Sequence, residues 1–180
     1  MNKLNIKKQL QKGFTLIELL IVIAVLGVLA AVILVAIDPI EQIARAEDAG
    51  RKSQVGQLSS AMQAYLVGQS LATAPAASAT WQTMLQNAGE IKSTFTAPGM
   101  AATCGPTPQT GYCYAPSGAN FVIWTYLESK SEVDKAAGVT LQACATGTTA
   151  AYIYSSSQGK AGNACITTGA APAVGTALIN

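Results

Sequence analysis

Residues 12–18 read KGFTLIE, and they open a run of apolar residues that extends from Phe14 to Ile37. Glu18 is the only formal charge among those 24 residues. A carboxylate costs about 2.5–3.5 kcal/mol near the centre of a membrane helix, and less toward either end. Such an acid is a functional hypothesis by default, so the chain is expected to supply it with a partner of opposite charge.

Three interpretations of this N-terminal segment compete. A cleaved secretory signal has a shorter apolar run and a small-residue cleavage site after it, whereas this run is long and begins with an acid. An ordinary membrane anchor fits the length, because 24 residues of helix span about 36 Å, but it explains neither Glu18 nor the Gly13-Phe14 junction. Four lysines and no acid precede the run, which predicts a cytoplasmic leader and an exported C-terminal domain.

The third interpretation rests on the sequence GFTLIE at residues 13–18. With the basic leader before it and the apolar run after it, it resembles the processing site of type IV prepilins and type II secretion pseudopilins over about the first 55 residues. The resemblance implies a prepilin peptidase that cuts between Gly13 and Phe14 and N-methylates Phe14; a 13-residue leader is on the long side for the family. The new amine lies one helical turn before Glu18 and would neutralise it, within a subunit or between neighbours.

Two residues mark where the long helix is expected to change direction. Gly27 lies inside the apolar run, and Pro39 follows it. Proline disrupts a helix interior but suits the first position of a new helix, where Asp38 and Glu41 would complete a capping box. We therefore expect a bend or an interruption between Gly27 and Pro39, the region where the pilins that this chain resembles commonly lose helical order in filaments.

The helix beyond Pro39 is expected to be amphipathic and to end near Gly68. Its apolar positions recur at spacings of three and four, which is typical of a helix packed on a domain: Val55, Leu58, Met62 and Tyr65. Two acid-before-base pairs, Glu41–Arg45 and Glu47–Arg51, are worth a few tenths of a kcal/mol each. These charges either bridge subunits or form a solvated helix face, and the pattern leaves both open.

The remaining residues, 69–180, predict one small domain with a thin core. Residues 71–80 read as a connector, and Thr80 is expected to cap a short helix over 81–87 that Gly89 ends and that Trp81 anchors in the core. Residues 111–115 and 120–127 predict one hairpin, and residues 151–155 and 164–168 a second around a loop at 158–163. We predict an α+β fold like that of type IV pilins, with about four antiparallel strands on the helix and an extended surface tail at 169–180.

The four cysteines predict disulfides rather than a metal site. The chain has no histidine and no Cys-x-x-Cys pair, so two disulfides formed in an oxidising compartment are favoured over zinc. Four cysteines allow three connectivities. Cys104–Cys113 and Cys144–Cys165 are favoured because each closes a short loop around predicted strands.

No pattern for catalysis, metal binding or nucleic-acid binding stands out. Without histidine the usual general base is missing, and no cofactor is predicted. Resemblance to the major pseudopilins would imply a C-terminal calcium loop with acidic side chains. No acidic side chain follows Asp134, so the sequence favours a pilus subunit over such a pseudopilin. Beyond Gly68 four lysines balance four acids, and the tyrosines alternate as in sheet packing, so no nucleic-acid partner is indicated.

These observations predict a structural subunit of a type IV pilus, not an enzyme. The expected parts are a cleaved cytoplasmic leader (1–13), a transmembrane and assembly segment (14–37), an amphipathic segment (38–68) and an extracytoplasmic β-rich domain (69–180). The resemblance implies several partners: other copies of the chain in a helical filament, a prepilin peptidase, a pilus assembly platform, and lipid before assembly. The subunit would move from the cytoplasmic membrane to an extracellular pilus. Two alternatives stay open, a minor pilin or pseudopilin of a secretion or competence filament, and a monomeric membrane-anchored binding domain.

Overall fold

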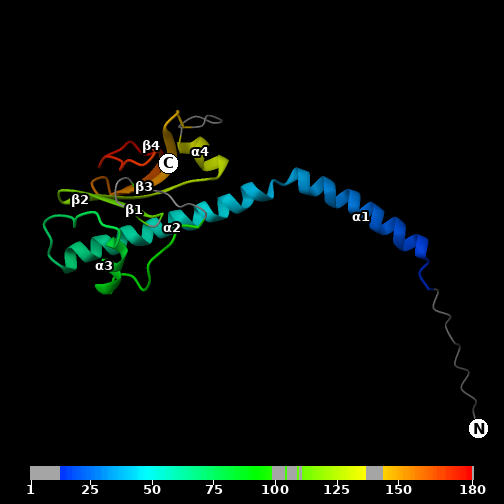
Figure 1. Cartoon of the computed structure of the whole chain (residues 1–180), viewed down its shortest axis with the longest axis horizontal. Coiled ribbons are helices and arrows are strands. Elements are labelled where there is room, and N and C mark those ends of the chain that lie inside the picture. The colour runs from blue at the N-terminus through cyan, green and yellow to red at the C-terminus, as the bar shows by residue number, and fades with distance from the viewer. Residues whose placement is uncertain (1–12, 99–103, 105–108, 110, 137–143, 180) are drawn as a thin grey trace, which may run out of the picture. The chain divides into compact units, whose positions relative to one another are not determined.

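The computed structural model describes residues 13–98, 104, 109, 111–136 and 144–179. The chain divides between Pro39 and Ile40 into two compact units (Figure 1). The elements follow in the order α1 (Leu16–Ala36), α2 (Pro39–Gly68), α3 (Trp81–Asn87), β1 (Cys113–Ser117), β2 (Asn120–Tyr126), α4 (Lys130–Ala136), β3 (Thr148–Ser155) and β4 (Lys160–Thr167). A long N-terminal helix followed by a four-stranded antiparallel sheet is the pilin-like α+β class that the sequence predicts.

The long helix is interrupted immediately before its proline. Ile37 caps α1 with an extended backbone (φ −110°, ψ 107°), and Pro39 opens α2. The ring of a proline disfavours helical dihedrals in the residue before it, and its missing N–H costs nothing at a helix start. The break lies at the proline end of the predicted stretch, because α1 continues through Gly27 without interruption.

The apolar stripe of α2 builds the core of the second unit, as its spacing predicts. Val55, Leu58 and Met62 are fully buried, and they pack against Trp81 and Leu85 of α3 and against one face of the sheet. Full burial of an aliphatic side chain of this size is worth about 1.5–3 kcal/mol. The helix ends at Gly68, also as predicted.

The sheet has the strand order β1-β2-β3-β4, and every neighbouring pair is antiparallel. The first hairpin turns at Gly118, whose φ of +61° suits a two-residue turn. The second turn is shorter than predicted. Lys160 pairs with Ser155, and Gly162 pairs with Ile153, so much of the expected loop at 158–163 is strand. Pairing with β3 outweighs the turn preference of a glycine-rich segment.

The two faces of the sheet bury two different clusters. Successive residues of a strand point to opposite faces, so Phe121 and Ile123 of β2 join α2, while Val122 and Trp124 face the other way. The C-terminal tail packs onto this second cluster through side chains such as Leu178. The tail lies at the surface as predicted, with Ala171, Ala173 and Ala177 exposed, but it also covers part of the sheet face that contains Trp124, which the sequence did not predict.

Two details of the short helices differ from the sequence prediction. The helix α4 was not predicted, although Ser129 and Glu132 have the spacing of a capping box. At seven residues α4 is too short to show a periodic pattern. Thr80 precedes α3 as predicted, but in the described structure its side chain makes no capping hydrogen bond.

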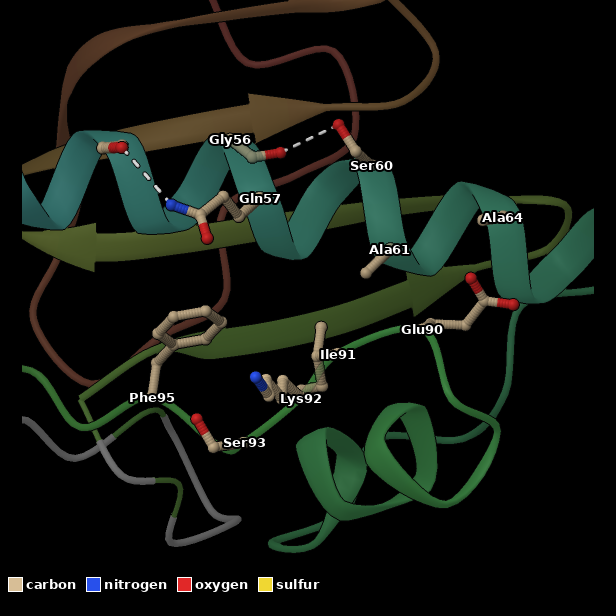
Figure 2. A pocket seen from close by; sticks show the side chains of 11 residues that line it. Gly56, Gln57, Ser60, Ala61, Ala64, Glu90, Ile91, Lys92, Ser93 and Phe95 are labelled. Atoms are coloured by element: carbon tan, nitrogen blue, oxygen red, sulfur yellow. Dashed lines mark hydrogen bonds between the residues drawn. The ribbon is translucent and has the colours of Figure 1, made fainter.

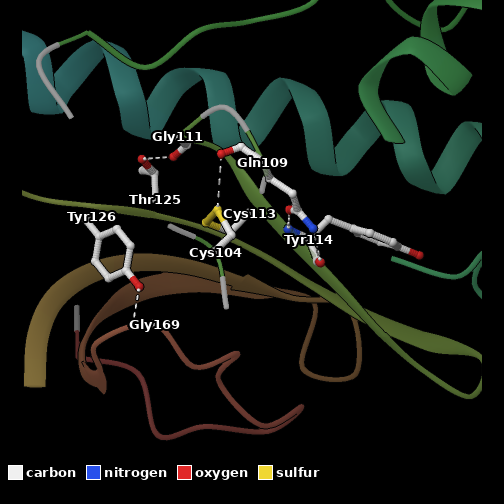
Figure 3. Close-up of a disulfide and its surroundings, with 8 residues drawn as sticks. All are labelled: Cys104, Gln109, Gly111, Cys113, Tyr114, Thr125, Tyr126 and Gly169. Carbon is white, nitrogen blue, oxygen red and sulfur yellow. Dashed lines mark hydrogen bonds between the residues drawn. A yellow bond between two sulfur atoms is a disulfide. The ribbon is translucent and has the colours of Figure 1, made fainter. Parts of the chain in front are cut away.

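Two disulfides join the cysteine pairs that the short loops favour. The Cα atoms lie 5.3 Å apart in Cys104–Cys113 and 5.7 Å apart in Cys144–Cys165, both within the range that a disulfide spans. Figure 3 shows the first bond beside Gln109, whose side-chain amide accepts from the Tyr114 N–H (2.6 Å) and donates to the Tyr114 carbonyl (3.2 Å). The Gln109 amide thus satisfies a backbone N–H and C=O of the edge strand β1.

Candidate functional site

The first turn of α1 contains Glu18, the carboxylate that the sequence analysis identified. Thr15 is the N-cap residue, and its Oγ1 accepts a hydrogen bond from the Glu18 N–H (3.3 Å). In return, Glu18 Oε2 accepts from the Thr15 backbone N–H (2.8 Å) and from the Thr15 hydroxyl (2.7 Å). This capping box draws the carboxylate back to the helix start, beside Phe14. Sequence reasoning overlooked Thr15, although Thr-x-x-Glu is the signature of such a box.

The rest of α1 is apolar and uncovered. The segment Leu16–Val35 is long and apolar enough to cross a membrane by length and composition, with a mean hydropathy of 3.1, and none of it is buried within the chain. A Cβ added at Gly27 would meet no side chain and no other segment within 4 Å, so the helix surface is open at this glycine. Such a helix is unstable in water and needs lipid or other helices around it.

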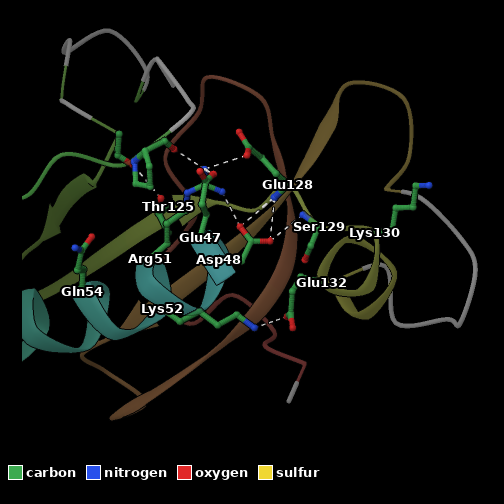
Figure 4. A network of polar contacts seen from close by, with 12 residues as sticks. Glu47, Asp48, Arg51, Lys52, Gln54, Thr125, Glu128, Ser129, Lys130 and Glu132 are labelled. Carbon is green, nitrogen blue, oxygen red and sulfur yellow. Dashed lines mark hydrogen bonds and ion pairs between the residues drawn. The ribbon is translucent and has the colours of Figure 1, made fainter. Parts of the chain in front are cut away.

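A charged network lies on α2, and Arg51 is its centre (Figure 4). The guanidinium is fully buried and contacts Asp48 (2.6 Å), Glu128 (3.1 Å), Glu47 (3.3 Å) and the carbonyl of Pro98. Burial opposes the charge, but hydrogen bonds and charge from Glu128 and Asp48 outweigh it and raise the pKa of Arg51. Both sequence interpretations of the Glu47–Arg51 pair are wrong, because Arg51 is neither solvated nor available to a neighbouring subunit.

Two carboxylates of α2 cap the start of α4. Asp48 accepts from the N–H groups of Ser129 (2.8 Å) and Glu128 (3.2 Å), and Glu41 accepts from that of Lys130 (3.0 Å). The N–H of Lys130 is the main cause that lowers the pKa of Glu41, and Arg45 acts in the same direction. The charged face of α2 therefore fastens the helix to its own domain.

An open groove runs along the opposite side of α2. It has a volume of about 950 Å³ and lies between small residues of the helix, such as Gly56 and Ser60, and the segment that contains Glu90, Lys92 and Phe95 (Figure 2). Its lining mixes apolar atoms with one acid and one base. It therefore lacks a charge pattern that would select a ligand.

The tyrosines of the domain serve mainly in packing, as their alternation predicts. Tyr112 and Tyr114 are buried against α2 and α3, and the Tyr114 hydroxyl donates to the Pro75 carbonyl (2.7 Å). Burial raises the pKa of Tyr112 to about 12 and raises that of Tyr114 as well. Neither ring is exposed to stack on a nucleic-acid base. Within the described part of the chain, no three His, Cys, Asp or Glu side chains cluster as metal ligands do.

Comparisons with known proteins agree with the chemistry of the N-terminal segment. Residues 8–34 match the family model of the prokaryotic N-terminal methylation motif. The matched residues include the Gly13-Phe14 junction and the capped Glu18.

The similar proteins are pilins. Two type IV major fimbrial proteins FimA of Dichelobacter nodosus are each 46% identical over 61 residues, which is 33% of this chain and 37% or 36% of theirs. A third FimA from the same organism is 47% identical over 57 residues, 31% of this chain and 35% of its own. The chain thus matches these curated relatives over about a third of their length. No solved structure matches it. The motif and the relatives together support a type IV pilin subunit.

Proposed function

We propose that this chain is a structural subunit of a type IV pilus and that it polymerises through its N-terminal helix. The observation that carries the proposal is α1 itself, an apolar helix that is exposed over Leu16–Val35 and begins with a capped carboxylate. Lipid of the cytoplasmic membrane surrounds this helix before assembly, and the same helices of other copies surround it in the extracellular filament. Segment 14–37 is the assembly segment, 38–68 supports the domain, and 69–180 forms the outer surface.

A processing step prepares the helix for assembly. A prepilin peptidase removes residues 1–13 by cutting between Gly13 and Phe14, and it then N-methylates Phe14. The cut leaves an ammonium group one residue before Thr15, whose N–H already holds Glu18 Oε2. An ammonium group and a carboxylate in an apolar setting neutralise each other. When the ammonium comes from an incoming subunit and the carboxylate from a neighbour, this pair sets the register that the assembly platform builds.

The test combines a mass measurement with electron microscopy. The exported subunit is expected to begin at methylated Phe14, and cells with the chain are expected to carry filaments in which it is the abundant subunit. Glu18→Gln keeps the length of the side chain but removes its charge, so filament yield should fall at least tenfold, while Glu90→Gln in the domain should leave it unchanged. An intact leader on the exported protein would refute the proposal. Scarcity of the chain in purified filaments would instead favour a minor pilin.

A further inference from the structure

Three side chains with complementary chemistry meet where α2, α4 and β4 come together. Lys52 of α2 forms an ion pair with Oε2 of Glu132 of α4, a pair drawn in Figure 4. Asn163 of β4 donates its Nδ2–H to the same Oε2 at 2.7 Å. Two donors bonded to one oxygen lie within about 6 Å of each other, so the amine and the carboxamide are neighbours.

The three groups are shielded and held in place. The side chains of Lys52 and Glu132 are 25% and 13% exposed, and Asn163 is 4% exposed. The Lys52 ammonium also lies over the ring of Tyr152, 5.3 Å from its centroid. The backbone of Asn163 is fixed on both sides, by its place opposite Tyr152 in the sheet and by two 2.8 Å hydrogen bonds to Ile179. Groups oriented in this way react as if at very high concentration.

We propose that Lys52 and Asn163 form an intramolecular amide bond, with Glu132 as the proton-transfer group. Within the ion pair, a proton passes from the Lys52 ammonium to the Glu132 carboxylate and leaves a neutral amine. The amine nitrogen attacks Cγ of Asn163, so the Nζ–Cγ bond forms. Glu132 then carries a proton from Nζ to Nδ2, the Cγ–Nδ2 bond breaks, and the nitrogen leaves as ammonia. Glu132 ends protonated, and no oxidant or other co-reactant is consumed.

The bond would join the long helix to the last strand of the sheet. Apart from the two disulfides, which lie within the C-terminal domain, packing and hydrogen bonds such as that from Gln63 to the Tyr154 hydroxyl connect α2 to that sheet in the described structure. A filament transmits tension along its helices. A covalent bond from Lys52 to Asn163 would pass that tension directly into the sheet, so that the domain stays attached to α2 under load.

Mass spectrometry of the full chain, purified in detergent and reduced, tests the bond. Loss of ammonia leaves the protein about 17 Da lighter than its sequence requires. Trypsin cannot cleave after a linked Lys52, so a branched peptide of residues 52–92 joined to residues 161–180 is expected, which distinguishes this bond from other losses of ammonia. The full mass, with separate linear peptides and cleavage after Lys52, would overturn the proposal.

Three variants assign the roles. Lys52→Arg keeps the positive charge beside Glu132 but provides no attacking amine, and Glu132→Gln removes the proton carrier, so both should restore the full mass. Lys92→Arg, at the edge of the groove, changes a lysine outside the cluster and should keep the deficit. A deficit that persists in Lys52→Arg would overturn the link, and one that persists in Glu132→Gln would overturn the proton-transfer role.

Discussion

Replacing Arg51 by methionine should lower the free energy of unfolding of the second unit by about 3–5 kcal/mol. Methionine approximates the volume of the arginine stem and removes the guanidinium. The substitution leaves Asp48, which is 1% exposed, without the cation that lies 2.6 Å away. It also deprives the Pro98 carbonyl of a donor.

The size of the effect follows from the burial of each partner. Glu47 and Glu128 are each about a third exposed, so water screens them and their pairs contribute up to about 1 kcal/mol. Asp48 dominates, because removing one member of a buried pair costs about 3–5 kcal/mol. The N–H groups of Glu128 and Ser129 still bind Asp48 in the variant, which places the expected value toward the low end.

Tryptophan fluorescence during denaturant unfolding measures this loss, because Trp81 and Trp124 are each 1% exposed and report on the domain core. Arg45→Met is the matched control. Arg45 pairs with Glu41 on the same helix but is 50% exposed, so its replacement should cost less than about 1 kcal/mol. If the two variants lose equal stability, Arg51 is not the centre of a buried network and the reasoning fails.

Three further predictions concern the turns, the disulfides and acid. Gly111→Ala should destabilise the domain by about 2–4 kcal/mol in chemical denaturation, because the φ of Gly111 is +76° and the new Cβ would lie 2.5 Å from the Cβ of Ala97. Gly118 has a φ of +61° but open space around it, so Gly118→Ala should cost only about 1–2 kcal/mol. Replacing both cysteines of one disulfide by serine should cost roughly 2.6 kcal/mol for Cys104–Cys113 and roughly 3.3 kcal/mol for Cys144–Cys165, since the two bonds close loops of 9 and 21 residues. Equal denaturation midpoints for the two double variants would contradict this order. The pKa of Glu41 is lowered in the folded state from 4.5, so its contribution to stability is present above pH 4.5 and is lost as the pH falls through the folded pKa. Glu41→Gln should therefore make the melting temperature fall less steeply on acidification. An unchanged slope would refute the capping role of Glu41.

Several features of this chain could be read from the sequence because the interactions that cause them are local. The apolar run after Gly13 specifies a membrane-length helix, and Pro39 ends it through its own ring. The spacing of Val55, Leu58 and Met62 specifies which side of α2 is buried. Turn residues such as Gly118 specify where the first hairpin reverses. Each effect acts over at most a few helical turns, so a short window of sequence contains its whole cause.

The roles of the charged residues could not be read in the same way. In sequence, Glu47–Arg51 is an ordinary surface pair at i, i+4. The fold brings Glu128 and Pro98 to the same guanidinium and turns the pair into a buried network. Such contacts join residues tens of positions apart, so no periodic pattern in the sequence predicts them.

The sequence by itself determined the N-terminal helix, the match of residues 8–34 to the N-terminal methylation motif and the α+β class, because hydropathy, charge and proline geometry are properties of neighbouring residues. Only the tertiary structure decided that Arg51 is buried, that the tail covers Trp124, and that Lys52 meets Glu132 and Asn163. The physical reason is desolvation. The environment of a charged side chain depends on which distant segments exclude water from it. The packing of the sheet against α2 determines which segments these are.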